Sequence, residues 1–227
     1  MPTYFVTGTD TDAGKTLVCC AILTAAGKKG YSTAALKPVA AGVIESARGN
    51  QNEDVLALAS ACSLSLSFKE MNPVFFPEPV APHVGASKAG QTLQARTLAQ
   101  QCLPVIDKQA DLTLVEGAGG WKVPLNNNET MADLVKELDM PVILVVGMRL
   151  GCLNHALLTA QAILADGLSL HGWIANRIDP DMQAYTENLE TLKTMMPAPM
   201  LAEIPWTDAD DKITELAGFI ELERFVG

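Results

Sequence analysis

The chain of 227 residues is poor in positive charge. Sixteen lysines and arginines stand against 26 aspartates and glutamates, which gives a formal net charge of −10 at pH 7. A protein that binds DNA or RNA needs basic surface to neutralise the phosphate backbone, so this charge argues against a nucleic-acid partner. Any site for a phosphorylated ligand must therefore supply its own local positive charge.

Long apolar runs are also missing. The longest ones, such as Val142 to Val146, are far too short to span a bilayer. Met1-Pro2-Thr3 leads directly into an apolar stretch, without the basic and apolar segment of a secretory leader. We therefore expect a protein of the cytoplasm with no membrane partner.

Cysteine and histidine spacings typical of metal sites are absent. The five cysteines show no C-x-x-C or Cys/His pattern, and we expect small buried thiols in a reducing compartment. The three histidines share no metal spacing either, so structural or surface roles are expected for them. These residues are Cys19, Cys20, Cys62, Cys102, Cys152, His83, His155 and His171.

Short apolar runs alternate with helical patterns along the whole chain. Aromatic residues make up only 5% of it and apolar residues 48%, as expected for parallel strands covered by helices. We predict an α/β fold of the P-loop NTPase type, with a doubly wound, mostly parallel sheet and helices on both faces, in one domain over residues 1–227. Predicted strands are Thr3–Thr7, Ser32–Leu36, Leu112–Val115, Pro141–Val146, Leu170–Ala175 and Met200–Ala202. Predicted helices are Lys15–Ala26, Glu53–Cys62, Leu93–Asp107, Met131–Leu138, Leu153–Asp166, Met182–Met195 and Ile213–Phe225.

A glycine-rich loop joins the first predicted strand to the first helix. Gly8 to Thr16 read G-T-D-T-D-A-G-K-T, which is typical of a phosphate-binding loop, although its first glycine comes one residue early. Backbone N–H groups and the helix N-terminus would face the phosphates, and Lys15 would reach their outer oxygens. The alternative is a glycine turn that merely connects strand and helix.

Three charged residues stand at the ends of predicted elements. Lys37 follows a strand and precedes Pro38, so it is a candidate second anion clamp beside the loop. Glu116 ends another strand and opens E-G-A-G-G, whereas Asp54 lies at a helix start. With Thr16 these carboxylates supply the oxygens that Mg²⁺ prefers. The alternatives are a solvated lysine, a solvated acid and an ordinary helix-start acid.

Three further segments are candidates for function. The proline-rich stretch Asn72–His83 is predicted to be an extended loop, either functional or a plain surface excursion. The helix start Gly151–Asn154 offers free N–H groups to a carboxylate, or is simply capped. Ala41–Asn52 has the glycines and polar residues of a mobile lid.

Taken together, these motifs resemble the dethiobiotin synthetase family, and the resemblance runs nearly from end to end. The slightly longer P-loop is itself similar to that of the family. The matching stretches are Tyr4–Thr11, Gly14–Thr16, Lys37–Ala40, Asp54, Asn72-Pro73, Glu78–His83, Val115–Trp121, Pro141–Gly147, Leu150–Ala156, Gly172–Asn176 and Glu203–Trp206.

The resemblance implies an ATP- and Mg²⁺-dependent ligase. The substrates would be 7,8-diaminononanoate, CO₂ or bicarbonate, and ATP, joined through a carbamate and a carbamic-phosphoric anhydride to give a cyclic urea, ADP and phosphate in biotin biosynthesis. It also implies a homodimer, in which the helix start Gly151–Asn154 of the partner takes the substrate's carboxylate tail.

Site residues follow from the resemblance in four groups. Lys37, Lys15 and Thr11 would be catalytic, and Thr16, Asp54 and Glu116 would hold Mg²⁺. Substrate would meet Thr11, Lys37, Ala41, Gly151, Cys152, Leu153 and Asn154. ATP would meet Asp12, Ala13, Gly14, Lys15, Thr16, Leu17, Asp54, Glu116, Gly117, Ala118, Gly119, Asn176, Arg177, Pro205, Trp206 and Thr207.

Four positions depart from the family pattern. Ala41 and Ala81 stand where small hydroxyl residues are common, and Asp12 replaces a glutamate. Arg177 stands where an aspartate can occur. A lost neutral hydrogen bond is worth only about 1 kcal/mol, so we expect activity to survive these changes.

Two other functions stay open at this point. An amidoligase of the cobyrinic-acid type usually carries an extra glutaminase domain, for which the chain has no room. An ATP-switched partitioning or positioning protein normally has a second lysine early in its P-loop, where this chain has G-T-D-T, and often basic or amphipathic segments.

Overall fold

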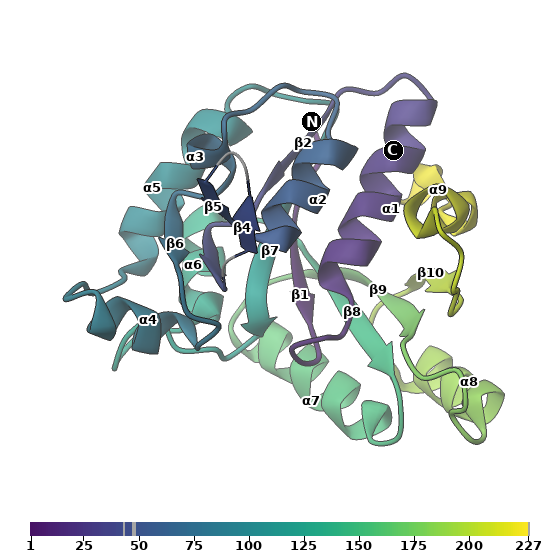
Figure 1. Cartoon of the computed structure of the whole chain (residues 1–227). Helices are drawn as coiled ribbons and strands as arrows, with labels where there is room; N and C mark the ends of the chain where they lie inside the picture. The colour runs from purple at the N-terminus through teal and green to yellow at the C-terminus, as the bar shows by residue number, and fades with distance from the viewer. Residues whose placement is uncertain (43, 47–48, 227) are drawn as a thin grey trace.

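Six parallel strands form the central sheet (Figure 1), in the order β10-β9-β8-β1-β7-β2. The computed structural model describes residues 1–42, 44–46 and 49–226. Because β7 returns to lie between β1 and β2 and later strands are added on the other side of β1, the predicted doubly wound sheet is confirmed. The strands are β1 (Thr3–Gly8), β2 (Thr33–Leu36), β7 (Leu112–Gly120), β8 (Val142–Met148), β9 (Leu170–Arg177) and β10 (Met200–Ile204).

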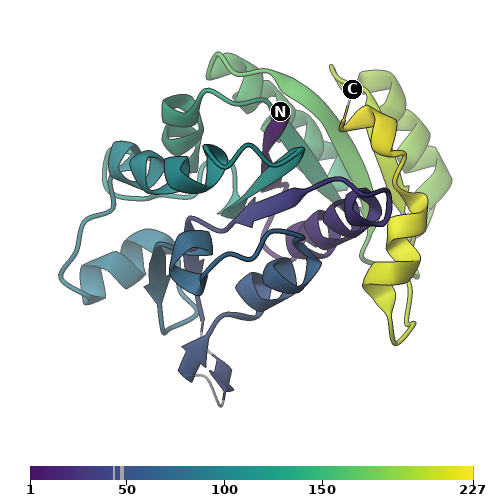
Figure 2. The same cartoon turned by 90° about the horizontal axis from the view of Figure 1, so that it is seen from above.

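Helices cover both faces of this sheet (Figures 1 and 2). One face packs against α1 (Lys15–Lys28), α2 (Glu53–Ala61) and α9 (Lys212–Leu216). The other packs against α5 (Ala95–Ile106), α6 (Met131–Leu138), α7 (Cys152–Ala165) and α8 (Tyr185–Met195).

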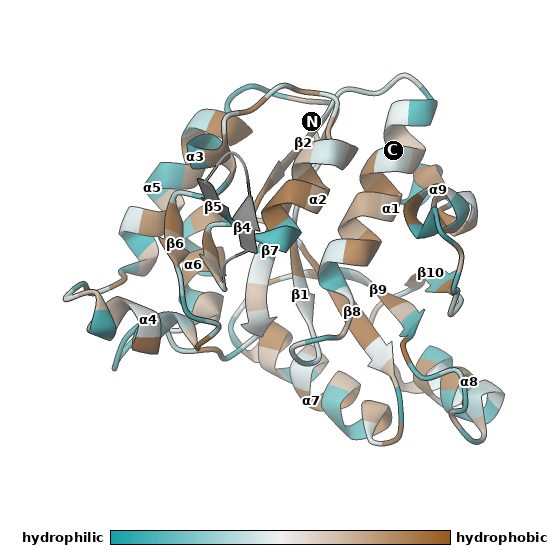
Figure 3. Cartoon of the chain, in the orientation of Figure 1, coloured by the Kyte–Doolittle hydropathy of each residue, from teal (hydrophilic) through white to brown (hydrophobic). Residues whose placement is uncertain are grey.

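Successive strand residues enter opposite cores. Phe5 of β1 packs on the α5–α6 side, whereas its neighbours Tyr4 and Val6 pack on the α1 side. All seven residues of β8 are buried, and Figure 3 shows the strands coloured as apolar with polar residues on the outer helix faces. None of the described helices combines the length and apolar character that crossing a bilayer requires.

The proline-rich stretch is not a plain extended loop, and that part of the prediction is wrong. After α3 (Phe68–Met71) it contains β6 (Val74–Phe76), which pairs in parallel with β3 (Val39–Ala41), and it ends in α4 (Pro82–Lys88). A strand of three residues gains its hydrogen bonds only from its distant partner, so local sequence carries little sign of it. Pro82 starts α4 because the first position of a helix needs no N–H donor.

The segment Ala41–Asn52 contains an antiparallel pair, β4 (Ile44–Ser46) with β5 (Gly49–Gln51), which stands out from the body of the molecule in Figure 2. Positions 43, 47 and 48 of the predicted lid lie outside the described residues.

The prediction of a C-terminal helix over Ile213–Phe225 is also wrong beyond Leu216. The helix α9 ends at Leu216, and two 3₁₀ segments follow, Ala217–Phe219 and Leu222–Arg224. Gly218 lowers helix propensity there, and Ile220, Leu222 and Phe225 all reach the α1-side core at spacings that one straight helix face does not provide.

Candidate functional site

The P-loop joins β1 to α1 at the carboxyl end of the sheet. Gly14 lies just before the helix with φ of 84°, a conformation that favours glycine. A Cβ at Gly14 would lie 2.0 Å from Nδ2 of Asn176. That amide, 2% exposed on β9, donates to the carbonyl of Ala13 at 2.9 Å. The end of β9 thus fixes the start of α1 and leaves room only for glycine there.

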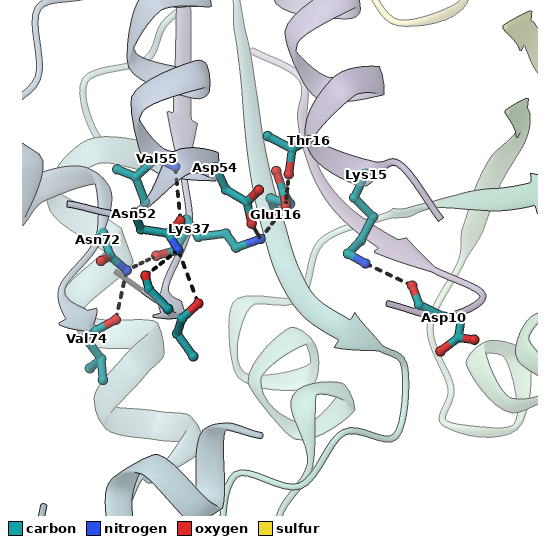
Figure 4. A network of polar contacts seen from close by, with 12 residues as sticks. Asp10, Lys15, Thr16, Lys37, Asn52, Asp54, Val55, Asn72, Val74 and Glu116 are labelled. Carbon is teal, nitrogen blue, oxygen red and sulfur yellow. Dashed lines mark hydrogen bonds and ion pairs between the residues drawn. The ribbon is translucent and has the colours of Figure 1, made fainter. Parts of the chain in front are cut away.

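The lysine of the loop is largely buried. Lys15 is 6% exposed and its Nζ donates to the backbone carbonyl of Asp10 at 3.1 Å (Figure 4). Asp10 also pairs through Oδ2 with Arg149 at 2.5 Å. Lys15 therefore rests against its own loop and lines the smaller hollow of the site.

Lys37 connects the two acids predicted to hold a metal (Figure 4). Its Nζ donates to Oδ2 of Asp54 at 2.8 Å and also to Oε1 of Glu116. The same Glu116 oxygen accepts from Oγ1 of Thr16 at 2.8 Å. Residues from the position after β2, from α2, from β7 and from the first turn of α1 therefore meet in one network.

Electrostatics keep this network ionised. Burial works to lower the pKa of Lys37, but the carboxylates of Glu116 and Asp54 outweigh it and raise that pKa above its ordinary value. Burial works to raise the pKa of Asp54, and the Lys37 ammonium outweighs it and lowers that pKa. Burial and the nearby Lys37 charge lower the pKa of Lys15. Lys37 and Asp54 therefore stabilise each other's charged forms, whereas the pKa shift of Lys15 works against its ammonium form.

The oxygens of this network suit a magnesium ion. The donor set is one hydroxyl and two carboxylates, and the buried Oε2 of Glu116 has no hydrogen-bond partner. Among the described residues, no group of three or more His, Cys, Asp or Glu side chains is placed to hold a metal. A metal here would accordingly depend on nucleotide oxygens and water as well as on Thr16, Asp54 and Glu116.

Two neighbouring hollows meet at Thr11, Lys37, Asp54 and Gly119. The smaller, about 230 Å³, has a polar and charged lining from the P-loop, Lys37 and Glu116. The larger, about 370 Å³, has an otherwise mostly apolar wall made of Val39, Ala40, Ala41, Pro79, Val80, Ala81, Pro82, Ala118 and Val123. The site therefore offers a charged compartment beside a mostly apolar one.

The remaining predicted nucleotide residues lie in the P-loop, at the start of α1, in β7 and, for Pro205 to Thr207, after β10, where they line neither hollow. Asp12 lines the smaller hollow, and Leu17 packs its side chain on the α1-side core. Gly117 lies against the ring of Phe5, where a Cβ would approach to 2.8 Å. Trp206 is 46% exposed beyond β10, after Pro205, and Thr207 donates to Oε2 of Glu215 at 2.7 Å.

Two predicted groups lie apart from these hollows. The Arg177 guanidinium donates to the carbonyl of Pro180 and stacks over Tyr185 of α8, on the sheet face opposite to Asn176. Alternation along β9 explains this, since neighbouring residues of a strand point to opposite faces. Gly151–Asn154 begins α7 and lines neither hollow, and Leu150 before it is 94% exposed.

Several residues of the site escaped the sequence-based predictions. Val39, Val80 and Val123 line the larger hollow, and two buried asparagines, Asn52 and Asn72, hold its framework. Apolar lining residues give no signal beyond their hydropathy. The asparagines do carry a sequence signal, because Asn52 precedes an acid and Asn72 precedes a proline within segments already singled out.

Comparisons with known proteins agree with this geometry. A family model described as an AAA domain matches residues 2–213. The ATP-dependent dethiobiotin synthetase BioD of Pseudomonas aeruginosa strain UCBPP-PA14 is 53% identical over 205 residues, which cover 90% of each chain. The BioD of Pseudescherichia vulneris is 47% identical over 96% of this chain and 91% of its own length. BioD 1 of Escherichia coli K12 is 46% identical over 96% and 97%.

Solved structures share the fold at low identity. The septum site-determining protein MinD of Pyrococcus horikoshii, complexed with Mg-ADP, has a TM-score of 0.57 at 20% identity and covers 98% of this chain and 88% of its own. The cell division ATPase MinD of Pyrococcus furiosus has a TM-score of 0.58 at 20% identity, with 100% and 96% covered. These likenesses confirm a fold of the P-loop NTPase type.

Proposed function

We propose a role in one reaction for each residue of this site. The premise is that the chain belongs to the AAA-domain family matched above and to the ATP-dependent dethiobiotin synthetases. The reaction joins 7,8-diaminononanoate and CO₂ at the expense of ATP and closes a five-membered cyclic urea. The pair of hollows that meet at Lys37 is the observation that best supports this assignment to the site.

Substrate binding would use both compartments. The alkyl chain of the diamine would lie along the apolar wall of the larger hollow, with its two amines towards Thr11 and Lys37. One amine captures CO₂ and loses a proton to give a carbamate. The Lys37 ammonium would stabilise this new anion at the border with the phosphate compartment.

Phosphoryl transfer would take place where the hollows meet. A carbamate oxygen attacks the γ-phosphorus, the bond to ADP breaks, and a carbamic-phosphoric anhydride results. Lys15 and Lys37 would neutralise the charge that builds on the phosphoryl oxygens, since both are ammonium groups within this compartment. The second amine then attacks the carbonyl carbon, phosphate leaves, and the urea ring closes with loss of a proton.

Thr16, Asp54 and Glu116 would hold Mg²⁺ in this scheme, with Asp54 exchanging its contact with Lys37 for the metal and Glu116 offering its unpartnered Oε2. When bound, the ion neutralises and orients the phosphate oxygens. The work of the chain is to present a hydroxyl and two carboxylates from three elements to one point.

The P-loop residues 12–17 would cradle the ATP phosphates, and Asn176 with Pro205, Trp206 and Thr207 would flank the base. Arg177 would contribute by its backbone, because its side chain lies on the opposite face. Residues 1–227 would form one synthetase domain that works in the cytoplasm as a homodimer. The helix start Gly151–Asn154 of the second subunit would bind the carboxylate tail, which fits the exposure of Gly151 and Asn154 and their absence from the lining of both hollows.

The decisive experiment follows label from CO₂ into product. Purified protein is incubated with 7,8-diaminononanoate, labelled bicarbonate and MgATP, and acid-stable label, ADP and the mass of dethiobiotin are measured together. We expect label and ADP to appear in equal amounts and only with the diamine present. ATP hydrolysis that ignores the diamine and responds to DNA or lipid would contradict the proposal and favour a switch protein.

A further inference from the structure

Lys37 lies just beyond the hydrogen-bonded part of the sheet. The pairing of β2 with β7 ends at Leu36 and Val115, and Pro38 has no N–H to continue it. Both backbone polar groups of Lys37 are instead satisfied by the turn after α3. Its N–H donates to the carbonyl of Met71 at 2.8 Å, and its carbonyl accepts from Nδ2 of Asn72 at 2.7 Å.

Asn72 is built rigidly into that turn (Figure 4). It is 3% exposed, its own N–H donates to the carbonyl of Phe68 at 2.8 Å, and its second amide hydrogen goes to Val74 at 2.8 Å. The N–H of Val74 in turn donates to the carbonyl of Pro38 at 3.2 Å. One side chain therefore ties the start of β6 to the residue that carries the central ammonium group.

The chemistry of this position calls for a donor. Both partners of the Asn72 side chain are carbonyl oxygens, so the amide nitrogen must face them, and its buried Oδ1 has no partner. Nδ2 donates both hydrogens, one to the backbone of Lys37 and one to Val74 at the start of β6, so the Asn72 side chain joins these two segments.

We propose that Asn72 is a positioning residue for the reaction, one that acts through Lys37 by holding its backbone so that Nζ stays at the border of the two hollows. The proposal rests on the proposed function for the role of Lys37. Displacement of a catalytic group by about 1 Å can cost on the order of a hundredfold in rate, so a clamp on one residue is enough to matter.

Turnover with a matched control tests this role. Asn72→Leu removes both amide donors at similar volume. Asn126→Leu is the control, because it removes a half-buried amide that donates to the carbonyl of Leu93 at 2.7 Å, takes part in three further hydrogen bonds and lines neither hollow. We expect kcat of Asn72→Leu to fall about ten- to a hundredfold, with KM for ATP and for the diamine changed less than about threefold. The Asn126 variant should keep its kcat. Equal kcat losses in both variants, or an unchanged kcat at Asn72, would overturn the proposal.

A second variant guards against a failure to fold. Asn72→Ser keeps one hydrogen-bond donor on a shorter side chain. We expect kcat to fall in this variant too, but by a smaller factor than in Asn72→Leu. Combined with Lys37→Ala, it should lower the residual kcat by less than about twofold, because a residue that acts only through Lys37 has nothing left to position. If Asn72→Ser lowered kcat by the same factor in the wild type and in the Lys37→Ala variant, the proposal that Asn72 acts through Lys37 would be refuted.

Hydrogen exchange tests the clamp without any turnover. The Lys37 amide should exchange at least about tenfold faster in Asn72→Ser than in the wild type, while the amide of Ala34 inside β2 is unchanged. A Lys37 amide that keeps its protection contradicts the clamp even if the enzyme is active. If instead the wild type makes no dethiobiotin but the exchange result holds, the proposed function has failed and the clamp has not.

Discussion

At the scale of single residues, the site is a set of charges that satisfy one another. Glu116 is 1% exposed, so leaving its carboxylate without a cation would cost several kcal/mol. Lys37 supplies that cation, and Thr16 supplies a hydrogen bond to the same oxygen. Substitution of Lys37, Glu116 or Thr16 therefore takes a charge or hydrogen-bond partner from the residues that remain.

Lys37→Ala should separate catalysis from stability. We expect turnover to fall about 10²- to 10³-fold, because an ammonium that stabilises developing charge is lost. Folding should survive, but the free energy of unfolding should drop by about 2–4 kcal/mol, since Glu116 is left buried without its cation. Steady-state kinetics and urea unfolding measure the two effects. Near-normal turnover would show that Lys37 is not catalytic.

Gly14→Ala tests the strict requirement for glycine before α1. The left-handed φ of 84° costs an alanine about 1 kcal/mol, and its Cβ would push Asn176 away from Ala13. We expect ATP affinity to fall about tenfold or more in a binding titration.

Gly27→Ala is the control for that change, because its Cβ would meet nothing within 4 Å and it lies inside α1. It should leave ATP binding unchanged and raise stability by up to about 1 kcal/mol. Equal affinities for the two variants would contradict the role given to Gly14.

The sequence allowed this site to be predicted in part. Lys37, Asp54 and Thr16 were recognisable because each stands next to the start or end of an element, and such ends converge in a parallel sheet. Glu116 was recognisable because it opens a glycine-rich stretch, although β7 continues past it to Gly120. Their mutual contacts were not, because strand order decides which ends are neighbours. The side of the sheet on which Arg177 lies also depends on the register of β9, which one motif does not define.

At the scale of elements, Asp166 joins the end of α7 to the turn after β7. Its Oδ2 accepts from Nε1 of Trp121 at 2.8 Å and from Lys122 at 2.6 Å, and its Oδ1 lies 3.0 Å from Lys136. These contacts anchor the turn that directly follows the glycine-rich end of β7, and that end of the strand lines the site.

Asp166→Asn should show the effect of this junction through pH. Burial works to raise the pKa of Asp166, but its bonds to Lys122, Trp121 and Lys136 outweigh it and lower the pKa to about 2. A lowered acid pKa adds stability above the unfolded value near 4, and this stability is lost as pH falls towards 2. The variant should be less stable by about 1 kcal/mol at pH 6, because partly exposed lysines weaken the effect.

Urea unfolding at pH 6, 4 and 3 gives the measurement. The gap between the wild type and Asp166→Asn should narrow as the pH falls below 4. A gap that stays constant with pH would mean that the charge of Asp166 contributes nothing and that the side chain acts by hydrogen bonding alone.

Element boundaries were predictable where packing and local pattern agree. The strand β7 was predicted to end at Val115 but runs to Gly120, because Gly120 pairs with Gly8 although glycine is a poor strand former. The strand β6 and the broken C-terminal helix depend in the same way on contacts with distant residues. Periodicity identified the long helices because their buried faces repeat locally.

At the scale of the whole molecule, the start and outer face of α7 carry exposed leucines. Leu150 is 94% exposed, Leu158 56% and Leu164 47%. The same segment holds the helix start Gly151–Asn154, which reaches neither hollow of its own chain. Both facts fit the proposal that this segment meets a second copy and completes its site.

Mixed dimers test that arrangement. Asn154→Glu places a negative charge where the carboxylate tail would bind, and Lys37→Ala disables the other half of the site. We expect each variant alone to lose at least about 90% of its activity. Mixed subunits should recover part of it, because some sites combine the intact half of each chain. The measurement is activity after refolding the two together.

Absence of recovery in subunits that still associate would mean that each site is built within one chain. Leu150→Glu provides the companion measurement by sedimentation, since a charge on an apolar contact should shift the protein towards monomers.

Lys37 forms salt bridges with both Asp54 and Glu116 at the centre of the site. The single ammonium of Lys37 faces two carboxylates, of which Glu116 is buried and Asp54 is partly exposed. Lys37 binds Oε1 of Glu116, so the unpartnered Oε2 of the same carboxylate would stay open to a metal. Glu116 would then join the lysine and the metal through its two oxygens, so the position of the Lys37 charge and the binding of MgATP would be linked through one carboxylate.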